Sequence, residues 1–187
     1  MRVWRLGDNV DTDAVAPGRY MKLGIEEIAA HCLESLLPSF SRDVKPGDFV
    51  VAGRNFGAGS SREHPPWALT AWGVRAILST GFADIFRNNS LKNGLLPIVV
   101  EHERHRQLFE LVAREPDVEL TVDLASQVVH LPGDEDLPFD VDPFSKLMLL
   151  EGTDELGYLL GKAPSIEAWE AAHAPRVDTR ERAGTSD

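Results

Sequence analysis

The stretch 49-FVVAGRNFGAGSSREHPPWALTAW-72 joins a short apolar run to a run with helical spacing through a small, polar loop. The run Phe49–Ala52 predicts a strand buried on both faces, and residues 66–72 predict a helix. In open α/β folds such a connection lies at the carboxyl edge of the sheet, where ligands bind. This stretch therefore predicts both the fold class and the location of a binding site.

Outside this stretch, apolar runs and helical patterns alternate along the chain. Strands are expected at 2–6, 74–78 and 95–100, and helices at 26–37, 82–91, 102–114, 142–150 and 166–172. Residues 118–123 and 127–131 alternate in period two, as a hairpin does. Pro97 favours a sheet edge or a bulge for its strand. We expect a three-layer α/β domain with a mixed sheet, followed by a polar, disordered tail over 175–187.

Composition limits the partners of the chain. The 187 residues carry a net charge of −11, with 11 basic and 10 acidic residues in 1–100 against 8 and 20 in 101–187. Such a chain repels nucleic acid and anionic membranes, so a small anionic substrate needs a few local cations. No apolar run is long enough for a membrane helix and the start lacks an apolar signal segment, so the cytoplasm is expected.

The single cysteine, Cys32, excludes an intrachain disulfide, an iron–sulfur cluster held by this chain and a zinc site of cysteines. We expect it to fill a small apolar slot in a helix. His102 and His105 are three residues apart on an expected helix, but no third ligand is evident, so no metal site is expected.

The glycine-rich loop carries the groups of a carboxylate-binding turn. Gly57 and Gly59 allow positive φ and a close approach of a ligand to the backbone. Exposed amides near a helix N-terminus favour an anion, and the planar fork of Arg62 grips a carboxylate at two points. Ser60 and Ser61 add hydroxyl groups.

A structural interpretation of this loop competes with the functional one. Ser60 to Glu63 fits the S-x-x-E capping box, in which Ser60 would only cap a helix. Pro65 and Pro66 lack amide hydrogens and disfavour helix at the preceding residue, so they predict a later helix start. A phosphate-binding P-loop is excluded because no lysine follows the glycines at the required spacing, and the dinucleotide fingerprint fails too.

Two further polar groups stand out. In 8-DNVDTDAVAPGRY-20, three aspartates suggest a calcium loop, but Asp13 and Arg19 occupy the places that need glycine and glutamate. An Asx-rich turn is the alternative. The second group, 86-FRNNS-90, is interpreted as a solvated helix face.

Three blocks in order, NVDTDAVAPGRY, NFGAGSSREHPPWAL and FADIFRNNSLKNGLLPI, resemble the small-subunit family of 3-isopropylmalate dehydratase, the swivelling domains of the aconitase superfamily. FDVDPFSKLMLLEGTDELGYLL and IEAWEA are similar to its bacterial-type members. The resemblance covers residues 3–172 and implies a β/β/α swivelling domain with a C-terminal helical extension over 1–174. It also implies a hydro-lyase that converts 2-isopropylmalate to 3-isopropylmalate in leucine biosynthesis.

The resemblance also implies a partner and the roles of site residues. A separate large subunit would carry a [4Fe-4S] cluster whose open iron binds the leaving hydroxyl; whether the isolated chain forms a homo-oligomer stays open. Ser60 would be the general base that takes the proton α to a carboxylate. Arg62 with Ser61 would bind substrate carboxylate, and Asp13 would line the site from the other side. Charge that builds on the carboxylate would be stabilised by Arg62 and loop amides.

One turn departs from the family pattern. Many relatives have a Tyr-Leu-Arg type turn where this chain has Tyr20-Met21-Lys22, in the loop that contacts the variable part of the substrate. Lys22 lacks bidentate geometry, and Arg19 is the nearby candidate to compensate. Homoaconitase or a dehydratase of a methylated malate is therefore an alternative with the same chemistry. A non-catalytic, carboxylate-binding scaffold subunit is an alternative from another class.

Overall fold

The computed structural model describes residues 2–115, 118–133 and 135–173. The chain divides into two compact units, Met1–Gly152 and Thr153–Asp187. The boundary expected at residue 174 stays a prediction, and the tail expected over 175–187 lies outside the described residues.

A four-stranded parallel sheet forms the middle of the first unit. Its strands follow the order of the sequence: β1 (Val3–Leu6), β2 (Phe49–Ala52), β3 (Ala76–Ser79) and β4 (Leu96–Val99). Every residue of β2 and β3 is buried, as expected of central strands covered on both faces. Pro97 lies in the edge strand β4, which confirms its expected place.

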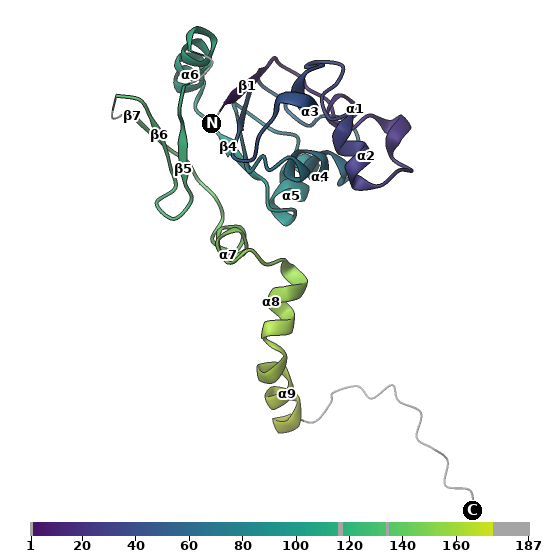
Figure 1. Cartoon of the computed structure of the whole chain (residues 1–187). Helices are drawn as coiled ribbons and strands as arrows, with labels where there is room; N and C mark the ends of the chain where they lie inside the picture. Colours follow the sequence, from purple (N-terminus) through teal and green to yellow (C-terminus); the bar gives the residue numbers. More distant parts are fainter. Residues whose placement is uncertain (1, 116–117, 134, 174–187) are drawn as a thin grey trace, which may run out of the picture. The chain divides into compact units, whose positions relative to one another are not determined.

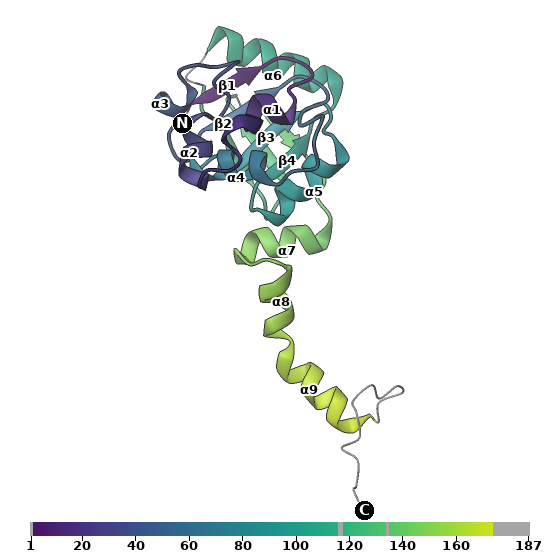
Figure 2. The same ribbon diagram turned by 90° about the vertical axis from the view of Figure 1, so that its right-hand side faces the viewer.

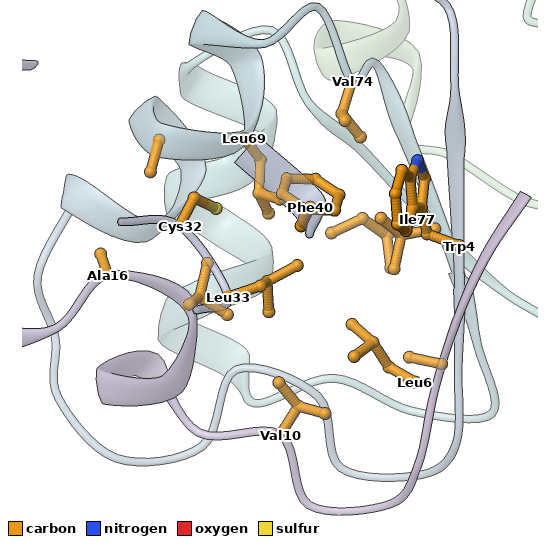
Figure 3. Packing of buried hydrophobic residues seen from close by; sticks show 14 of the residues in the cluster. Trp4, Leu6, Val10, Ala16, Cys32, Leu33, Phe40, Leu69, Val74 and Ile77 are labelled. Atoms are coloured by element: carbon orange, nitrogen blue, oxygen red, sulfur yellow. The ribbon is translucent and has the colours of Figure 1, made fainter. Parts of the chain in front are cut away.

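Short helices cover one face of this sheet. They are α1 (Thr12–Val15), the 3₁₀ helix η1 (Gly18–Tyr20), α2 (Ile25–Ala30), α3 (Phe40–Asp43), α4 (His64–Ala71) and α5 (Asp84–Lys92). Figure 3 shows Trp4, Leu6 and Ile77 of the sheet facing Leu33, Phe40 and Leu69 of the helical layer. Burial of these side chains removes apolar area from water and holds the two layers together.

Two expectations for this layer need correction. The helix expected at 26–37 ends at Ala30, because the chain turns there and Leu33 has a φ of 57°, outside the helical region. Cys32 lies in that turn rather than in a helix, and it is fully buried among apolar side chains as expected.

The other face of the parallel sheet packs against α6 (His102–Arg114) and an antiparallel sheet. The antiparallel strands are β5 (Thr121–Asp123), β6 (Val128–Leu131) and β7 (Glu135–Pro138), in that order. Val51 and Leu78 of the parallel sheet share a core with Leu108 of α6 and Val129 and Leu137 of this second sheet. Figure 1 shows α6 and β5–β7 on one side of the parallel strands and α1–α5 on the other, and Figure 2 looks onto the helical side.

These layers confirm the α/β class and the β/β/α arrangement. The one mixed sheet that was expected is instead two sheets of one strand direction each. The physical reason is local: β5, β6 and β7 are joined by short turns, so they pair with one another as antiparallel neighbours.

The last helices follow β7. Asp142 caps α7 (Pro143–Glu151), which ends the first unit and contacts α5. The second unit contains α8 (Glu155–Gly161) and α9 (Ala163–Ala172). Neither β7 nor α8 was expected, and α9 begins three residues earlier than expected. No helix in the described ranges is long and apolar enough to cross a membrane.

Candidate active site

Three segments meet at the carboxyl edge of the parallel sheet, each following a neighbouring strand. The loop after β2 is hydrogen-bonded on one side to the segment after β1, with Gly57 N–H to the Val10 carbonyl at 2.7 Å and Thr12 N–H to the Ala58 carbonyl at 2.8 Å. On the other side, Phe56 N–H donates to the Gly81 carbonyl at 3.0 Å. The glycine-rich loop is therefore held between its two neighbours along its length.

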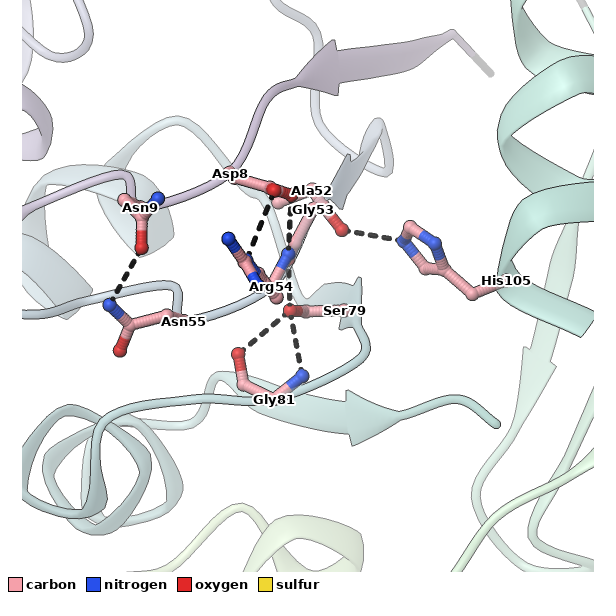
Figure 4. Close-up of polar contacts among 9 residues, drawn as sticks. All are labelled: Asp8, Asn9, Ala52, Gly53, Arg54, Asn55, Ser79, Gly81 and His105. Atoms are coloured by element: carbon pink, nitrogen blue, oxygen red, sulfur yellow. Dashed lines mark hydrogen bonds and ion pairs between the residues drawn. The ribbon is translucent and has the colours of Figure 1, made fainter. Parts of the chain in front are cut away.

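Polar side chains fix the start of the loop, as Figure 4 shows. The buried hydroxyl of Ser79 donates to the Gly53 carbonyl, and the carboxylate of Asp8 accepts from the Arg54 N–H at 3.0 Å. The ring Nε2–H of buried His105 donates to the Ala52 carbonyl at 2.6 Å. His105 is thus engaged by the backbone, and among the described residues no group of three His, Cys, Asp or Glu side chains is placed to hold a metal ion.

Two glycines shape the middle of the loop. Gly57 has a φ of +80°, and a Cβ there would lie 2.2 Å from Cγ of Phe86 on α5. Gly59 has a φ of +108°, and a Cβ there would lie 3.1 Å from Oγ1 of Thr12. The positive φ at both positions confirms the conformation expected of these glycines, and the approach of Phe86 leaves no room for a side chain at Gly57. The close approach of a ligand stays a prediction.

Ser60 and Ser61 lie outside any helix. Ser60 is half-buried, and its N–H donates to Oγ1 of Thr12 at 3.0 Å; Ser61 is exposed. The N-cap of α4 is Glu63, without a side-chain capping bond, so the capping-box interpretation of Ser60 is wrong. The roles expected of Ser60 and Ser61 at a substrate stay predictions.

The start of α4 differs from the expected one. The helix begins at His64, two residues before the expected start at Pro66. Pro65 and Pro66 occupy the first turn, where the N–H that proline lacks has no intrahelical partner in any case.

Arg62 connects the loop to the segment after β1. Its Nη2 donates to a carboxylate oxygen of Asp13, and its Nη1 contacts Sδ of Met21. The side chain of Arg62 is 19% exposed and that of Asp13 is 69% exposed, so Asp13 pairs with the guanidinium from the solvent side. Nε of Arg62 is buried and makes no hydrogen bond within the described part of the chain.

The other two expected cations are placed differently. Arg19 forms an ion pair with Glu34 and lies over the ring of Tyr20, 4.8 Å from the centroid. A hydrogen bond with Tyr20 and the charge of Glu34 raise the pKa of Arg19. Glu34 also contacts His31, whose ring stacks on Tyr20 at 3.7 Å. Lys22 is exposed and has neither a hydrogen bond nor an ion pair in the ranges that the structure describes.

The structure thus brings Ser60, Ser61, Arg62 and Asp13 together, while the roles of Arg19 and Lys22 at a substrate stay predictions. Sequence reasoning missed two residues of this site. Thr12, between the two aspartates, is 1% exposed and holds Ser60. Asn89, in the group interpreted as a solvated face, donates to the carbonyls of Ser61 and Arg62. In the sequence, the adjacent pair Asn88 and Asn89 on the helix expected at 82–91 was the feature that could have pointed to this contact.

Known proteins are similar to this chain over most of its length. The profile of the aconitase C-terminal domain matches residues 34–103, and a profile described as LeuD_N matches residues 106–143. The chain is 45% identical to the 3-isopropylmalate dehydratase small subunit of Roseiflexus castenholzii, over 93% of this chain and 91% of that protein. It is 46% identical to the protein of the same name from Solibacter usitatus, over 91% and 90%.

A solved structure is similar along the same length. The crystal structure of a 3-isopropylmalate dehydratase (leuD) from Methanocaldococcus jannaschii matches with a TM-score of 0.73 and 30% sequence identity. The match covers 90% of this chain and 96% of that one.

Proposed function

The chain belongs to the family of 3-isopropylmalate dehydratase small subunits, and on that premise we propose that it works with a large subunit as a hydro-lyase of leucine biosynthesis. The complex interconverts 2-isopropylmalate and 3-isopropylmalate by removing and adding water. The observation that carries this proposal is the loop that presents Ser60 and Arg62 beside Asp13, in a chain similar to those relatives over nine tenths of its length.

Ser60 is the general base in this proposal. It takes the proton α to a substrate carboxylate, and the negative charge that develops on the carboxylate is stabilised by Arg62 with Ser61. Serine is a weak base unless its alkoxide is stabilised. The N–H groups of Ser61 and Arg62 follow Ser60 in a segment outside helix and strand, where they are candidate donors to that alkoxide. Asp13 orients the guanidinium of Arg62 toward the substrate.

The residues of this chain do not fit an iron–sulfur cluster. Cys32 is the single cysteine, and burial raises the pKa of its thiol, which disfavours the thiolate that a cluster needs. The described residues also contain no metal-ligand group. The proposal therefore assigns the [4Fe-4S] cluster to the large subunit and gives this chain the proton transfer and the carboxylate binding.

The turn Gly18–Lys22 is the part of the chain that is proposed to select among possible acid substrates. Arg19 and Lys22 are the proposed contacts to the variable end of the substrate; Lys22 is exposed and Arg19 is engaged by Glu34. A substrate with an isopropyl group needs no cation at that end, whereas homocitrate brings a further carboxylate. The exposed Lys22 could pair with such a carboxylate, so this turn alone does not choose between the two acids. Isopropylmalate is proposed on the similarity to the relatives of that name, and homocitrate is kept as a substrate to be tested. A cytoplasmic location is part of the proposal and rests on the biosynthetic role.

Reconstitution with the large subunit tests the proposal. Turnover of 2-isopropylmalate, homocitrate and methylated malates is compared, and failure on isopropylmalate with brisk turnover of another acid would refute the substrate. Ser60→Ala should lower kcat at least about a hundredfold, the size of a lost general base. Ser35→Ala, at an exposed serine after α2, is the matched control and should keep full activity. Near-full activity of Ser60→Ala would favour a scaffold subunit instead.

A further inference from the structure

The loop that carries Ser61 and Arg62 cannot join the helix that follows it. If α4 continued one turn toward the N-terminus, the carbonyls of Ser61 and Arg62 would accept from the N–H groups four residues later. Those residues are Pro65 and Pro66, which have no N–H. The two prolines therefore prevent α4 from extending into the loop. They also leave the carbonyls of Ser61 and Arg62 without helical N–H donors.

One side chain of α5 supplies the replacement. Nδ2 of Asn89 lies 3.1 Å from the Ser61 carbonyl and 3.4 Å from the Arg62 carbonyl, and it carries two hydrogens. The side-chain amide of Asn89 thus donates to both carbonyls whose helical N–H donors are missing because of the prolines.

The helix α5 is itself held in register with the loop. Phe86 lies under Gly57, where a Cβ would meet its ring, and Asn89 follows one turn later on the same helix face. Asn93, one turn further, donates through Nδ2 to the Asn89 carbonyl at 2.7 Å and accepts from Nε1 of Trp67 on α4. Phe86 and Asn89 of α5, together with its C-cap Asn93, therefore contact the loop and the helix after it.

We infer that Asn89 is a positioning residue for the reaction: it fixes the backbone of Ser61 and Arg62 so that the loop presents the base and the arginine together. The inference rests on the proposed function of Ser60 and Arg62. Thr12 of α1 accepts from the N–H of Ser60, so the peptide units at 60–62 are restrained by two elements, α1 and α5. Without Asn89, one of the two restraints is lost and the site has to be ordered during each turnover.

The test compares Asn89 with its neighbour in the reconstituted complex, at saturating large subunit and with active complex quantified. Asn89→Ala should lower kcat/KM about tenfold to a hundredfold, through both a lower kcat and a higher KM, because small misplacement of reacting groups is costly. Asn89→Asp should be worse, since a carboxylate has no hydrogen to donate to the two carbonyls. Asn88→Ala and Asn88→Asp, at the exposed adjacent position, should stay within about twofold of the parent.

A merely structural role predicts a different result. In that case Asn89→Ala would lower the melting temperature and the yield of complex, but kcat and KM per active complex would be unchanged, and the inference would be overturned. Amide hydrogen exchange at residues 60–63 gives a readout without chemistry: it should accelerate about tenfold in Asn89→Ala and not in Asn88→Ala. Unchanged exchange in Asn89→Ala would overturn the positioning role of Asn89. An active Ser60→Ala variant would instead overturn the proposed base, and it would not affect the interpretation of the exchange rates.

Discussion

The bond between Thr12 and Ser60 can be separated from the packing of Thr12 by two substitutions. Thr12 is 1% exposed, and its Oγ1 accepts from the Ser60 N–H at 3.0 Å. Thr12→Val keeps the branched shape but removes the acceptor, which leaves the Ser60 amide without this partner. Thr12→Ser keeps the hydroxyl and removes one buried methyl group.

The two substitutions should cost similar stability for different reasons. Loss of this partly buried hydrogen bond costs about 0.5–1.5 kcal/mol, and a lost buried methyl costs about 1 kcal/mol including the small cavity. Each kcal/mol lowers Tm by about 2–4 °C in a chain of this size. Both variants should therefore melt a few degrees below the parent chain.

Activity should separate them. Thr12→Ser keeps the bond to Ser60, so kcat of the reconstituted complex should stay within about threefold of the parent, whereas Thr12→Val should lose at least about tenfold because the proposed base is no longer held. Thermal melting followed by circular dichroism and turnover of 2-isopropylmalate measure the two effects. Equal kcat in the two variants would refute the claim that Thr12 positions Ser60.

Three further predictions concern the loop, a helix cap and the thiol. Gly57→Ala should destabilise the chain by more than about 3 kcal/mol in thermal or urea unfolding, because its Cβ would clash with Phe86, whereas Gly94→Ala, also at positive φ but in open space, should cost only about 1 kcal/mol. Asp142→Ala removes the N-cap of α7 and should cost about 1 kcal/mol at pH 7. Hydrogen bonds from Ser145 lower the pKa of Asp142 in the folded chain. The contribution of Asp142 to the free energy of unfolding is therefore present above the unfolded-state pKa and is lost as pH falls through the folded-state pKa. Urea unfolding at pH 7 and at pH 3 should show a smaller difference in unfolding free energy between variant and parent at pH 3. Burial raises the pKa of Cys32, so the folded chain should react with a thiol reagent far more slowly than the urea-unfolded chain, and equal rates would contradict the burial.

The strands of the parallel sheet could be predicted from the sequence because most of them are short apolar runs, although one mixed sheet was expected in place of this parallel one. Phe49–Ala52 is buried on both faces, and its boundaries agree with the expected ones. The strand β7 could not be predicted in this way, because Glu135 to Pro138 has one buried side chain and is a strand only by pairing with β6. The end of α2 was missed for a similar reason: the helical pattern continues to Leu37, but Leu33 turns inward with positive φ to fill the core.

In the candidate site, too, some residues could be predicted from the sequence and others could not. The polar loop was recognisable because glycines that permit positive φ, exposed amides and an arginine together suit an anion, and the DTD segment was recognisable from the resemblance to the family. Asn89 was not, because its role depends on two proline residues 23 and 24 positions earlier in the sequence and on the packing that sets α5 beneath the loop. The missing donors are visible in the sequence, but the group that replaces them is set by tertiary structure.

The pair of Arg62 and Asp13, proposed for carboxylate binding, contacts the turn that is proposed to select the substrate. A Cβ on Gly18 would lie 3.3 Å from both Nη1 of Arg62 and the carboxylate of Asp13, and Met21 contacts the same Nη1. Gly18 and Met21 belong to the turn that is proposed to contact the variable end of the substrate. The constant and the variable ends of a bound acid would therefore meet neighbouring parts of one surface. A change of this turn that is meant to alter the substrate would move Arg62 as well, unless Gly18 and the packing of Met21 are kept.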